Sequence, residues 1–325
     1  MLVLAVGVLY LVKSKQDWGA FKASVQNLSP VTAFAGLGLF VLSQVLVALR
    51  WYSLLRIQKI DIGAWPAIKL TFVGLYYNNF LPSSVGGDAF RAWYVTHHTP
   101  KRLEAVFSVL FDRMVGFAGL ILMAGAAFFF VPNREQMEKI SFNTSFFKHL
   151  ADQYGEIAVI VLAVLGLVVV GAVIYSETRR FLVRIAGVLV ARGVELGLRV
   201  LAAVKIYVCR PFSMIWVMVL TFFCQFLFIL GLWLVGSELG IKAPLVYYLI
   251  FFPISWVIGV LPVSIGGAVV VEGMLVFLFW SFAGVPQSQA LALALAQRIL
   301  ILAGSLPGMF VHIAGKHAPT EFLVD

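Results

Sequence analysis

The chain has 325 residues, of which 62% are hydrophobic and only 12% carry a charge. A soluble domain carries about 25% charged residues, so this composition leaves too little polar surface to cover a globule in water. The apolar stretches are long and continuous, as in residues 158–174 and 211–236, whereas the strands of a membrane barrel alternate over about ten residues. We therefore expect an all-α polytopic membrane protein, which excludes a soluble enzyme and a disulfide-rich secreted module.

The net charge of +9 arises from 24 basic and 15 acidic residues. In a membrane protein such an excess reflects basic cytoplasmic loops that face anionic lipid, so we expect the lipid bilayer, and not nucleic acid, as the partner. Cys209 and Cys224 have neither the spacing nor the neighbours of a metal site. Because no nucleotide-binding motif is present either, we expect no metal and no cofactor.

Six apolar stretches are candidates for crossing the bilayer, which takes about 20 helical residues. The first is too short by itself and would need a natural start upstream of Met1 or thinner lipid. The predicted crossings are residues 1–12, 31–55, 105–131, 156–175, 211–236 and 286–314.

Basic residues orient these crossings, because Lys and Arg gather in cytoplasmic loops. They occupy residues 50–59, 101–102 and 179–210, whereas residues 132–155 mix both signs of charge. We therefore place the basic stretches 50–59, 101–102 and 179–210, together with the C-terminus, in the cytoplasm. Within residues 176–210 charges recur among apolar side chains, which predicts an amphipathic helix on the inner leaflet; an ordinary solvated linker helix is the alternative.

Residues 62–98 and 244–283 do not match simple crossings. A Leu-Pro and a Gly-Gly interrupt each stretch, and the piece after the break is short. Residues 62–98 also lie between two cytoplasmic basic clusters, so they must cross an even number of times. A re-entrant hairpin satisfies both conditions better than two complete helices do.

The two breaks repeat each other. Residues 81–87 (LPSSVGG) match residues 261–267 (LPVSIGG), and the flanking crossings follow the same offset. Three full crossings separate the two hairpins, so the second hairpin enters from the opposite face. This predicts an inverted-topology repeat. The single transmembrane domain, residues 1–325, then consists of repeat one (31–131), connecting helices (132–210) and repeat two (211–314).

The breaks suit an anion site. Proline and glycine free backbone groups, which at membrane depth are tolerated only beside protein or a water-filled cavity. Each returning arm begins near its glycine pair, so a helix N-terminus with free amides lies near the midplane and favours anions. A packing kink at the glycines is the alternative.

Polar side chains gather around both breaks and on the crossings that follow them. Each charge at this depth costs about 2.5–3.5 kcal/mol unless it is paired or hydrated. We expect a cavity in which arginines hold an anionic group. The alternative is a set of ion pairs, Asp88 or Asp112 with Arg113 and Glu272 with Arg298, that only fix helix register. The predicted substrate-binding residues are Asn78, Asn79, Ser83, Ser84, Gly86, Gly87, Asp88, Arg91, Asp112, Arg113, Ser264, Gly266, Gly267, Glu272 and Arg298.

The run YNNFLPSSVGGDAFR, residues 77–91, resembles the membrane region of lysylphosphatidylglycerol synthetases and their stand-alone, flippase-like relatives. Further matches are Arg50-Trp51, Asp112-Arg113 with Gly116, and the second Leu-Pro-x-Ser-Ile-Gly-Gly. Where the family shows Gly-Gly-x-Gly-x-Arg-Glu, residues 266–272 read GGAVVVE, which keeps the glutamate and lacks the arginine.

In bifunctional members of that family, this region moves an aminoacylated lipid that a soluble C-terminal domain makes. The present chain ends at Asp325, shortly after the last predicted crossing, so the resemblance implies a stand-alone translocator without synthetase activity and with no catalytic residues. It further implies a flippase or scramblase of a phosphate-bearing lipid in the cytoplasmic (inner) membrane of a prokaryote. A polytopic enzyme acting on a lipid-linked substrate and a transporter of a small anion remain alternatives.

Overall fold

The computed structural model describes residues 29–80, 86–131, 206–207, 209–259 and 270–315, all of which belong to one compact unit. In these ranges all regular secondary structure is helical, with no strand. The helices are α3 (Pro30–Ile57), α4 (Ala64–Phe80), α5 (Gly86–His97), α6 (Arg102–Phe128), α10 (Pro211–Glu238), α11 (Leu245–Gly259), α12 (Val270–Phe282) and α13 (Gln287–Ile313).

Four helices, α3, α6, α10 and α13, are long and apolar enough to cross a membrane. Each has 27 or 28 residues, which gives a length of about 40 Å against a hydrocarbon core of about 30 Å. Their positions match four of the predicted crossings. The other two, 1–12 and 156–175, lie outside the described residues, as does most of the predicted interfacial helix 176–210.

Each interrupted stretch forms a pair of short helices. α4 and α5 have 17 and 12 residues, and α11 and α12 have 15 and 13. Even the longest of these reaches only about 26 Å, too short for a simple crossing. The order long, short, short, long therefore occurs twice along the described chain.

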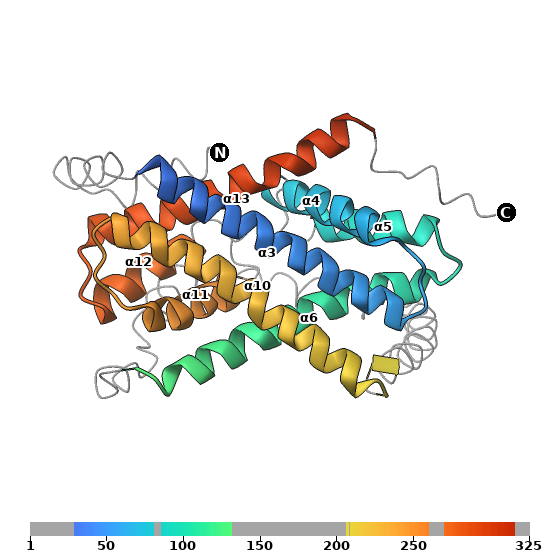
Figure 1. Cartoon of the computed structure of the whole chain (residues 1–325), viewed down its shortest axis with the longest axis horizontal. Coiled ribbons are helices and arrows are strands. Elements are labelled where there is room, and N and C mark those ends of the chain that lie inside the picture. The colour runs from blue at the N-terminus through green and yellow to red at the C-terminus, as the bar shows by residue number, and fades with distance from the viewer. Residues whose placement is uncertain (1–28, 81–85, 132–205, 208, 260–269, 316–325) are drawn as a thin grey trace, which may run out of the picture. The chain divides into compact units, whose positions relative to one another are not determined.

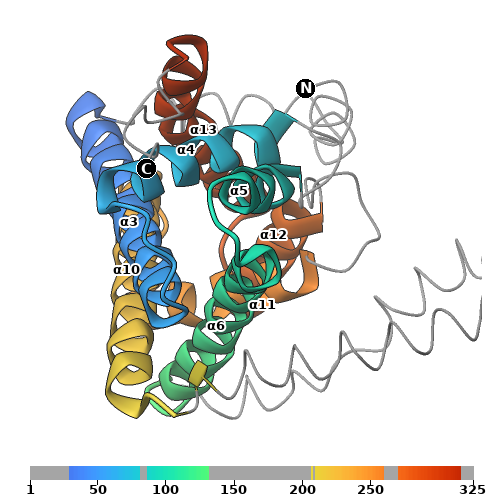
Figure 2. The same ribbon diagram turned by 90° about the vertical axis from the view of Figure 1, so that its right-hand side faces the viewer.

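The two halves contact each other in matching pairs. α3 packs along α10, α4 packs on α13, and α11 packs on α6. In the order long, short, short, long, α4 corresponds to α11 and α13 corresponds to α6. The α4–α13 contact and the α11–α6 contact are therefore equivalent. Figure 1 shows α3 and α10 running in opposite directions, with α4 and α5 near one end of the long helices and α11 and α12 near the other. Figure 2 confirms that α3 and α10 lie side by side.

Small residues allow the close helix contacts. Gly36 of α3 faces Gly231 of α10, where a Cβ atom would come within 3.2 Å of the Gly36 carbonyl oxygen. At Gly308 of α13 a Cβ atom would overlap the carbonyl of Phe72 in α4. Small residues at helix crossings are typical of membrane bundles, whose helices gain little from hydrophobic exclusion and associate through packing.

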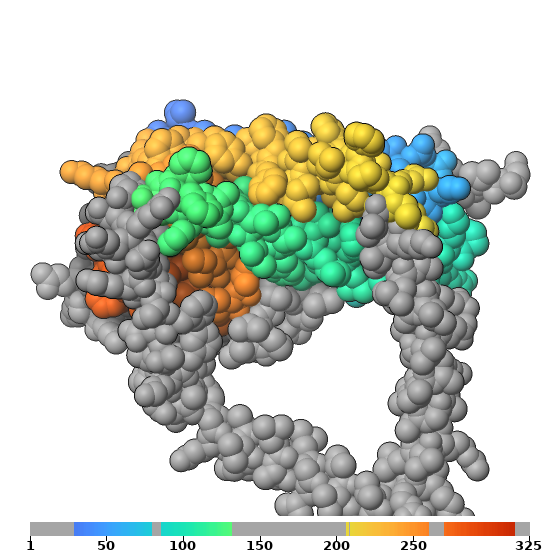
Figure 3. Space-filling model, turned by 90° about the horizontal axis from the view of Figure 1, so that it is seen from below, coloured from blue at the N-terminus to red at the C-terminus, as the bar shows by residue number. Residues whose placement is uncertain are grey.

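The outer face of the bundle is apolar. α6 and α10 lie next to each other on the face seen in Figure 3. Both helices expose large hydrophobic side chains, among them Met114, Ile121, Trp216 and Phe223. A soluble monomer rarely exposes so many large apolar side chains, but lipid solvates them without cost.

Lys101 ties the α5–α6 connection to the end of α3. Its ammonium donates hydrogen bonds to the backbone carbonyls of Gln58 and Lys59, both at 3.2 Å. We expect Lys101→Met to lower the free energy of unfolding by about 1 kcal/mol, because two carbonyls lose a charged donor. Thermal unfolding of the purified protein in detergent measures this. Arg102→Met, which removes the neighbouring exposed charge, is the control. An equal loss of unfolding free energy in both variants would show that the bonds from Lys101 to the two carbonyls do not stabilise the fold.

Candidate functional site

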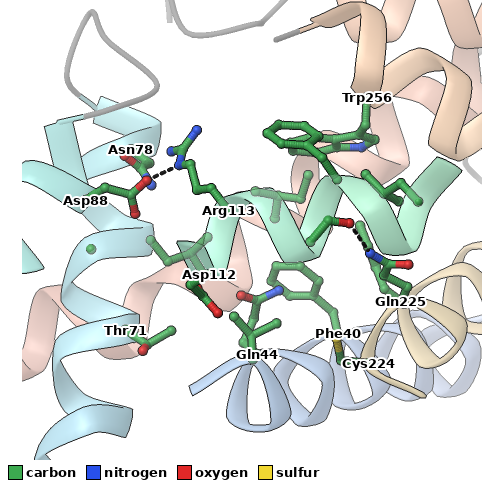
Figure 4. Close-up of a pocket in the computed structure, with 18 of the residues that line it drawn as sticks. Phe40, Gln44, Thr71, Asn78, Asp88, Asp112, Arg113, Cys224, Gln225 and Trp256 are labelled. Carbon is green, nitrogen blue, oxygen red and sulfur yellow. Dashed lines mark hydrogen bonds and ion pairs between the residues drawn. The ribbon is translucent and has the colours of Figure 1, made fainter. Parts of the chain in front are cut away.

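A cavity lies within the bundle, and all eight described helices contribute to its wall. Its volume is about 330 Å³, at the lower end of the range of small-molecule sites, about 300–1,000 Å³. Figure 4 shows that its two ends differ in chemistry. Asn78, Asp88 and Arg113 gather toward one end, and Trp256 and Gln225 lie toward the other.

A continuous ion-pair network forms the charged end. Arg50 Nε donates to Asp112 Oδ1 at 2.8 Å, and Arg91 Nη2 lies 3.4 Å from Asp112 Oδ2. The other nitrogen of Arg91, Nη1, lies 3.4 Å from Asp88 Oδ1, and Arg113 Nε contacts Asp88 Oδ2. The network thus runs from Arg50 of α3 through Asp112, Arg91 and Asp88 to Arg113 of α6. The side chain of Arg113 is 30% exposed, whereas those of the other four are less than 10% exposed.

A second ion pair contributes to the site from the other half. Two guanidinium nitrogens of Arg298, on α13, contact Glu272 Oε1, on α12, and both side chains are buried. Glu272 lies in the first turn of α12, as Asp88 does in the first turn of α5. Carboxylates in a first turn are stabilised by the positive end of the helix dipole. Both ion pairs expected from the sequence, Asp88 with Arg113 and Glu272 with Arg298, are present.

Two glycines bring α5 against α4 and so position Asp88 and Arg91. A Cβ atom at Gly87 would overlap the carbonyl of Gly74, and one at Gly74 would meet the Arg91 side chain at 2.9 Å. The Gly87 amide donates to Asn78 Oδ1 at 2.8 Å. Asn78 therefore stabilises the start of α5, which is where a helix leaves its first amides without internal partners.

Aromatic rings also line the cavity, and one of them, Trp256, lies toward the end opposite Asp88 (Figure 4). Phe40 and Phe228 have ring centroids 4.8 Å apart, Phe228 and Phe252 5.0 Å, and Phe252 and Trp256 5.9 Å. Phe117 lines the same cavity. A space with an arginine-rich end and an aromatic end suits an occupant that is itself anionic at one end and apolar at the other.

Residues 1–308 match the family described as the lysylphosphatidylglycerol synthase TM region. The chain belongs to this family. A UPF0104 membrane protein of Methanothermobacter thermautotrophicus is 22% identical over 300 residues, which cover 87% of this chain and 84% of that protein. The predicted resemblance is thus confirmed, and with it a multi-pass membrane protein.

The structure locates most of the predicted site residues of this family member. Gly86 and Gly87 begin α5, and Glu272 holds Arg298, but these three are not among the described residues that line the cavity. Ser83, Ser84, Ser264, Gly266 and Gly267 lie outside the described residues. The predicted residues that line the cavity are Asn78, Asn79, Asp88, Arg91, Asp112, Arg113 and Arg298.

Arg50 was expected in a cytoplasmic basic cluster, and this expectation is wrong. Its side chain is buried, lines the cavity and pairs with Asp112. The reason is that α3 continues to Ile57, which places Arg50 two helical turns inside the end of the helix. The apolar residues that follow Arg50 in the sequence are the signal that indicates burial.

Arg91 rests on an aromatic ring that sequence reasoning did not assign to the site. Its guanidinium lies 4.0 Å from the centroid of Trp51, whose indole N–H donates to Ser108 Oγ at 3.2 Å. Arg91 Nε has no hydrogen-bond partner, so the ring face supports a guanidinium that the two carboxylates satisfy only in part.

We expect Trp51→Phe to lower the free energy of unfolding by about 1 kcal/mol, because it removes the bond to Ser108 and keeps a ring. Trp51→Leu should cost about 2 kcal/mol more, because the cation–π contact and ring area are lost as well. The control is Trp65, which has Lys69 over its ring at 5.6 Å but is 64% exposed. Thermal unfolding measures both. If Trp65→Leu lowers the free energy of unfolding as much as Trp51→Leu does, the contact between Trp51 and Arg91 adds no stability of its own.

Proposed function

We propose that this chain translocates a phosphate-bearing lipid across the cytoplasmic membrane of a prokaryote, as a flippase or scramblase. The observation that carries the proposal is an arginine-rich cavity inside a bundle with four helices long and apolar enough to span a membrane. Charges buried at membrane depth are expensive and usually mark a transport pathway.

The size of the cavity supports binding of the headgroup alone. Its volume of about 330 Å³ lies at the lower end of the range for small-molecule sites, about 300–1,000 Å³. This suffices for a phosphate and a small substituent, but not for two long acyl chains. The chains of the lipid would therefore stay in the bilayer while the headgroup occupies the cavity.

Arg113 and Arg298 would neutralise the phosphate from the two halves of the molecule. Guanidinium groups bind phosphate through two parallel N–H bonds, which gives both affinity and orientation. Asp88 and Glu272 would hold these arginines in place between transport events. The C-terminus would lie in the cytoplasm, and transport would be passive or coupled to an ion.

We further propose that α3–α6 and α10–α13 are inverted repeats, with α4–α5 and α11–α12 as re-entrant hairpins. The repeated order of helix lengths, the matching inter-half contacts and the opposite directions of α3 and α10 support this. In such an arrangement each half can adopt the conformation of the other, which opens a central site first to one face and then to the other.

The test is movement of fluorescent phospholipids in proteoliposomes, followed by dithionite quenching of the outer leaflet. Protein-free liposomes should lose about half of the signal, and the protein should raise the loss well above half. Product formation from a lipid-linked substrate by the purified protein would instead support an enzyme. Uptake of a soluble anion without a lipid cargo would support an anion transporter, and either result without lipid movement would overturn the proposal.

A further inference from the structure

The two halves of the bundle differ in how their helices are held together. In the first half Asp112 of α6 accepts hydrogen bonds from Arg50 of α3 at 2.8 Å and from Arg91 of α5 at 3.4 Å, so one carboxylate joins three helices. In the second half Glu272 and Arg298 join α12 to α13, but α10, α11 and α12 contain no lysine or arginine. The described helices of the second half therefore have no counterpart of the contacts around Asp112.

Gln297 occupies the place of Asp112 in the second half. α6 and α13 both have 27 residues, and Asp112 and Gln297 hold the same position when counted from the first residue of each helix. The Gln297 side chain is 0% exposed, and among the described residues neither its Oε1 nor its Nε2 has a hydrogen-bond partner. A buried amide with two unpaired atoms destabilises the conformation that contains it.

Gln297 lies next to the cavity without lining it. The described residues of α13 that line the cavity are Arg298 and Ile301. Ile301 is four positions after Gln297, which places the two side chains one helical turn apart on the same face. A shift of α13 by about one turn would therefore bring the Gln297 amide to the cavity wall. Water in the cavity would there supply the hydrogen bonds that the amide lacks in the observed conformation.

We infer that Gln297 is the switch residue of the second half: α13 moves against the first half, which Asp112 holds together, and Gln297 gains its hydrogen bonds only when the cavity opens. This rests on the proposed function, because alternating access needs two conformations. The unpaired amide raises the free energy of the observed conformation and so increases the population of the open one. Asp112 is already bonded, so it provides no such gain in the first half.

The test replaces Gln297 by methionine, which has a similar length and no hydrogen-bonding group. Gln297→Met should raise the midpoint of thermal unfolding in detergent by about 2 °C, because two unpaired polar atoms leave the interior. It should also slow lipid movement in proteoliposomes about fivefold, because one net hydrogen bond no longer favours opening. A purely structural residue would not combine higher stability with slower movement. Gln297→Asn keeps an amide, and its rate should stay close to that of the wild type.

Cys224 reports opening independently of lipid movement. It lines the cavity and is only 2% exposed, and the chain has just one other cysteine, Cys209. In a Cys209→Ser background, alkylation of Cys224 by N-ethylmaleimide in detergent, counted by intact-protein mass spectrometry, therefore follows the opening of the cavity. Gln297→Met should slow this reaction by the same factor, about fivefold.

The matched control is Tyr248→Phe. Tyr248 of α11 lies in the same half, is 0% exposed and is not among the residues that line the cavity. Its hydroxyl, too, has no hydrogen-bond partner among the described residues. Removing this hydroxyl should raise the midpoint of unfolding by about 2 °C, as Gln297→Met does, and leave the rates of alkylation and lipid movement unchanged.

Three results would overturn the inference: unchanged alkylation and lipid movement in Gln297→Met, a lower midpoint of unfolding in that variant, or an equal slowing in Tyr248→Phe. Slower alkylation in Gln297→Met, with no lipid movement by the wild type, would overturn translocation and leave the role of Gln297 in opening standing. Lipid movement by the wild type, with both rates unchanged in Gln297→Met, would do the reverse.

Discussion

Alanine at Arg113 or at Arg298 is expected to slow lipid movement in proteoliposomes at least tenfold, which corresponds to about 1.4 kcal/mol in the barrier. Both guanidiniums line the cavity, and they come from opposite halves of the bundle. A phosphate that passes the middle of the membrane loses water on all sides, so each lost arginine removes a charge-assisted bond that stabilises it there.

The two variants differ in their expected effect on folding. Removing Arg113 leaves Asp88 with Arg91 as a partner, so the protein should remain folded. Removing Arg298 deprives Glu272 of its buried ion pair, which is costly. The double variant Glu272→Gln/Arg298→Gln removes both charges and separates a loss of transport from a loss of structure.

The control for both is Arg56→Ala, because Arg56 is exposed and pairs with Asp61 away from the cavity. Its rate should match that of the wild type. Near-normal rates in Arg113→Ala and in the Glu272/Arg298 double variant, with folded protein in each, would show that the cavity arginines do not contact the cargo.

The long helices were predictable because their signals are local. α3 begins at Pro30 because Ser29 Oγ caps the amide of Val31 at 3.2 Å, one residue before the predicted start. α6 begins at Arg102 and not at residue 105, because its first turn is polar but still helical. Hydropathy detects the apolar part of a helix and overlooks such polar turns.

Pairs of charges were predictable for a different reason. A carboxylate at membrane depth needs a cationic partner, and the sequence places few basic residues at that depth. A pair between Glu272 and Arg298 could therefore be predicted. The position of Arg50 and the role of Trp51 were not predicted, because an apolar helix gives no periodic signal to separate its lipid-facing side from its buried side. The aromatic end of the cavity was missed for the same reason.

The pair of Arg50 and Asp112 should dominate the stability of the bundle. Arg50→Leu is expected to lower the free energy of unfolding by about 3–5 kcal/mol, because Asp112 then keeps only its 3.4 Å contact with Arg91. Asp112→Leu should cost a similar amount, because Arg50 then loses its carboxylate partner. It keeps hydrogen bonds to Thr221 Oγ1 at 3.4 Å and to the backbone carbonyl of residue 112 at 3.3 Å, both uncharged.

The double variant Arg50→Leu/Asp112→Leu should be more stable than either single variant, because two apolar side chains replace a charge pair and no charge is left alone. Unfolding of the four proteins in detergent yields the coupling energy. The exposed pair Arg56–Asp61 is the matched control, and its coupling should stay below about 1 kcal/mol. If the losses of unfolding free energy at residues 50 and 112 are additive, the two side chains do not stabilise each other. Arg91 would then be the arginine that stabilises Asp112.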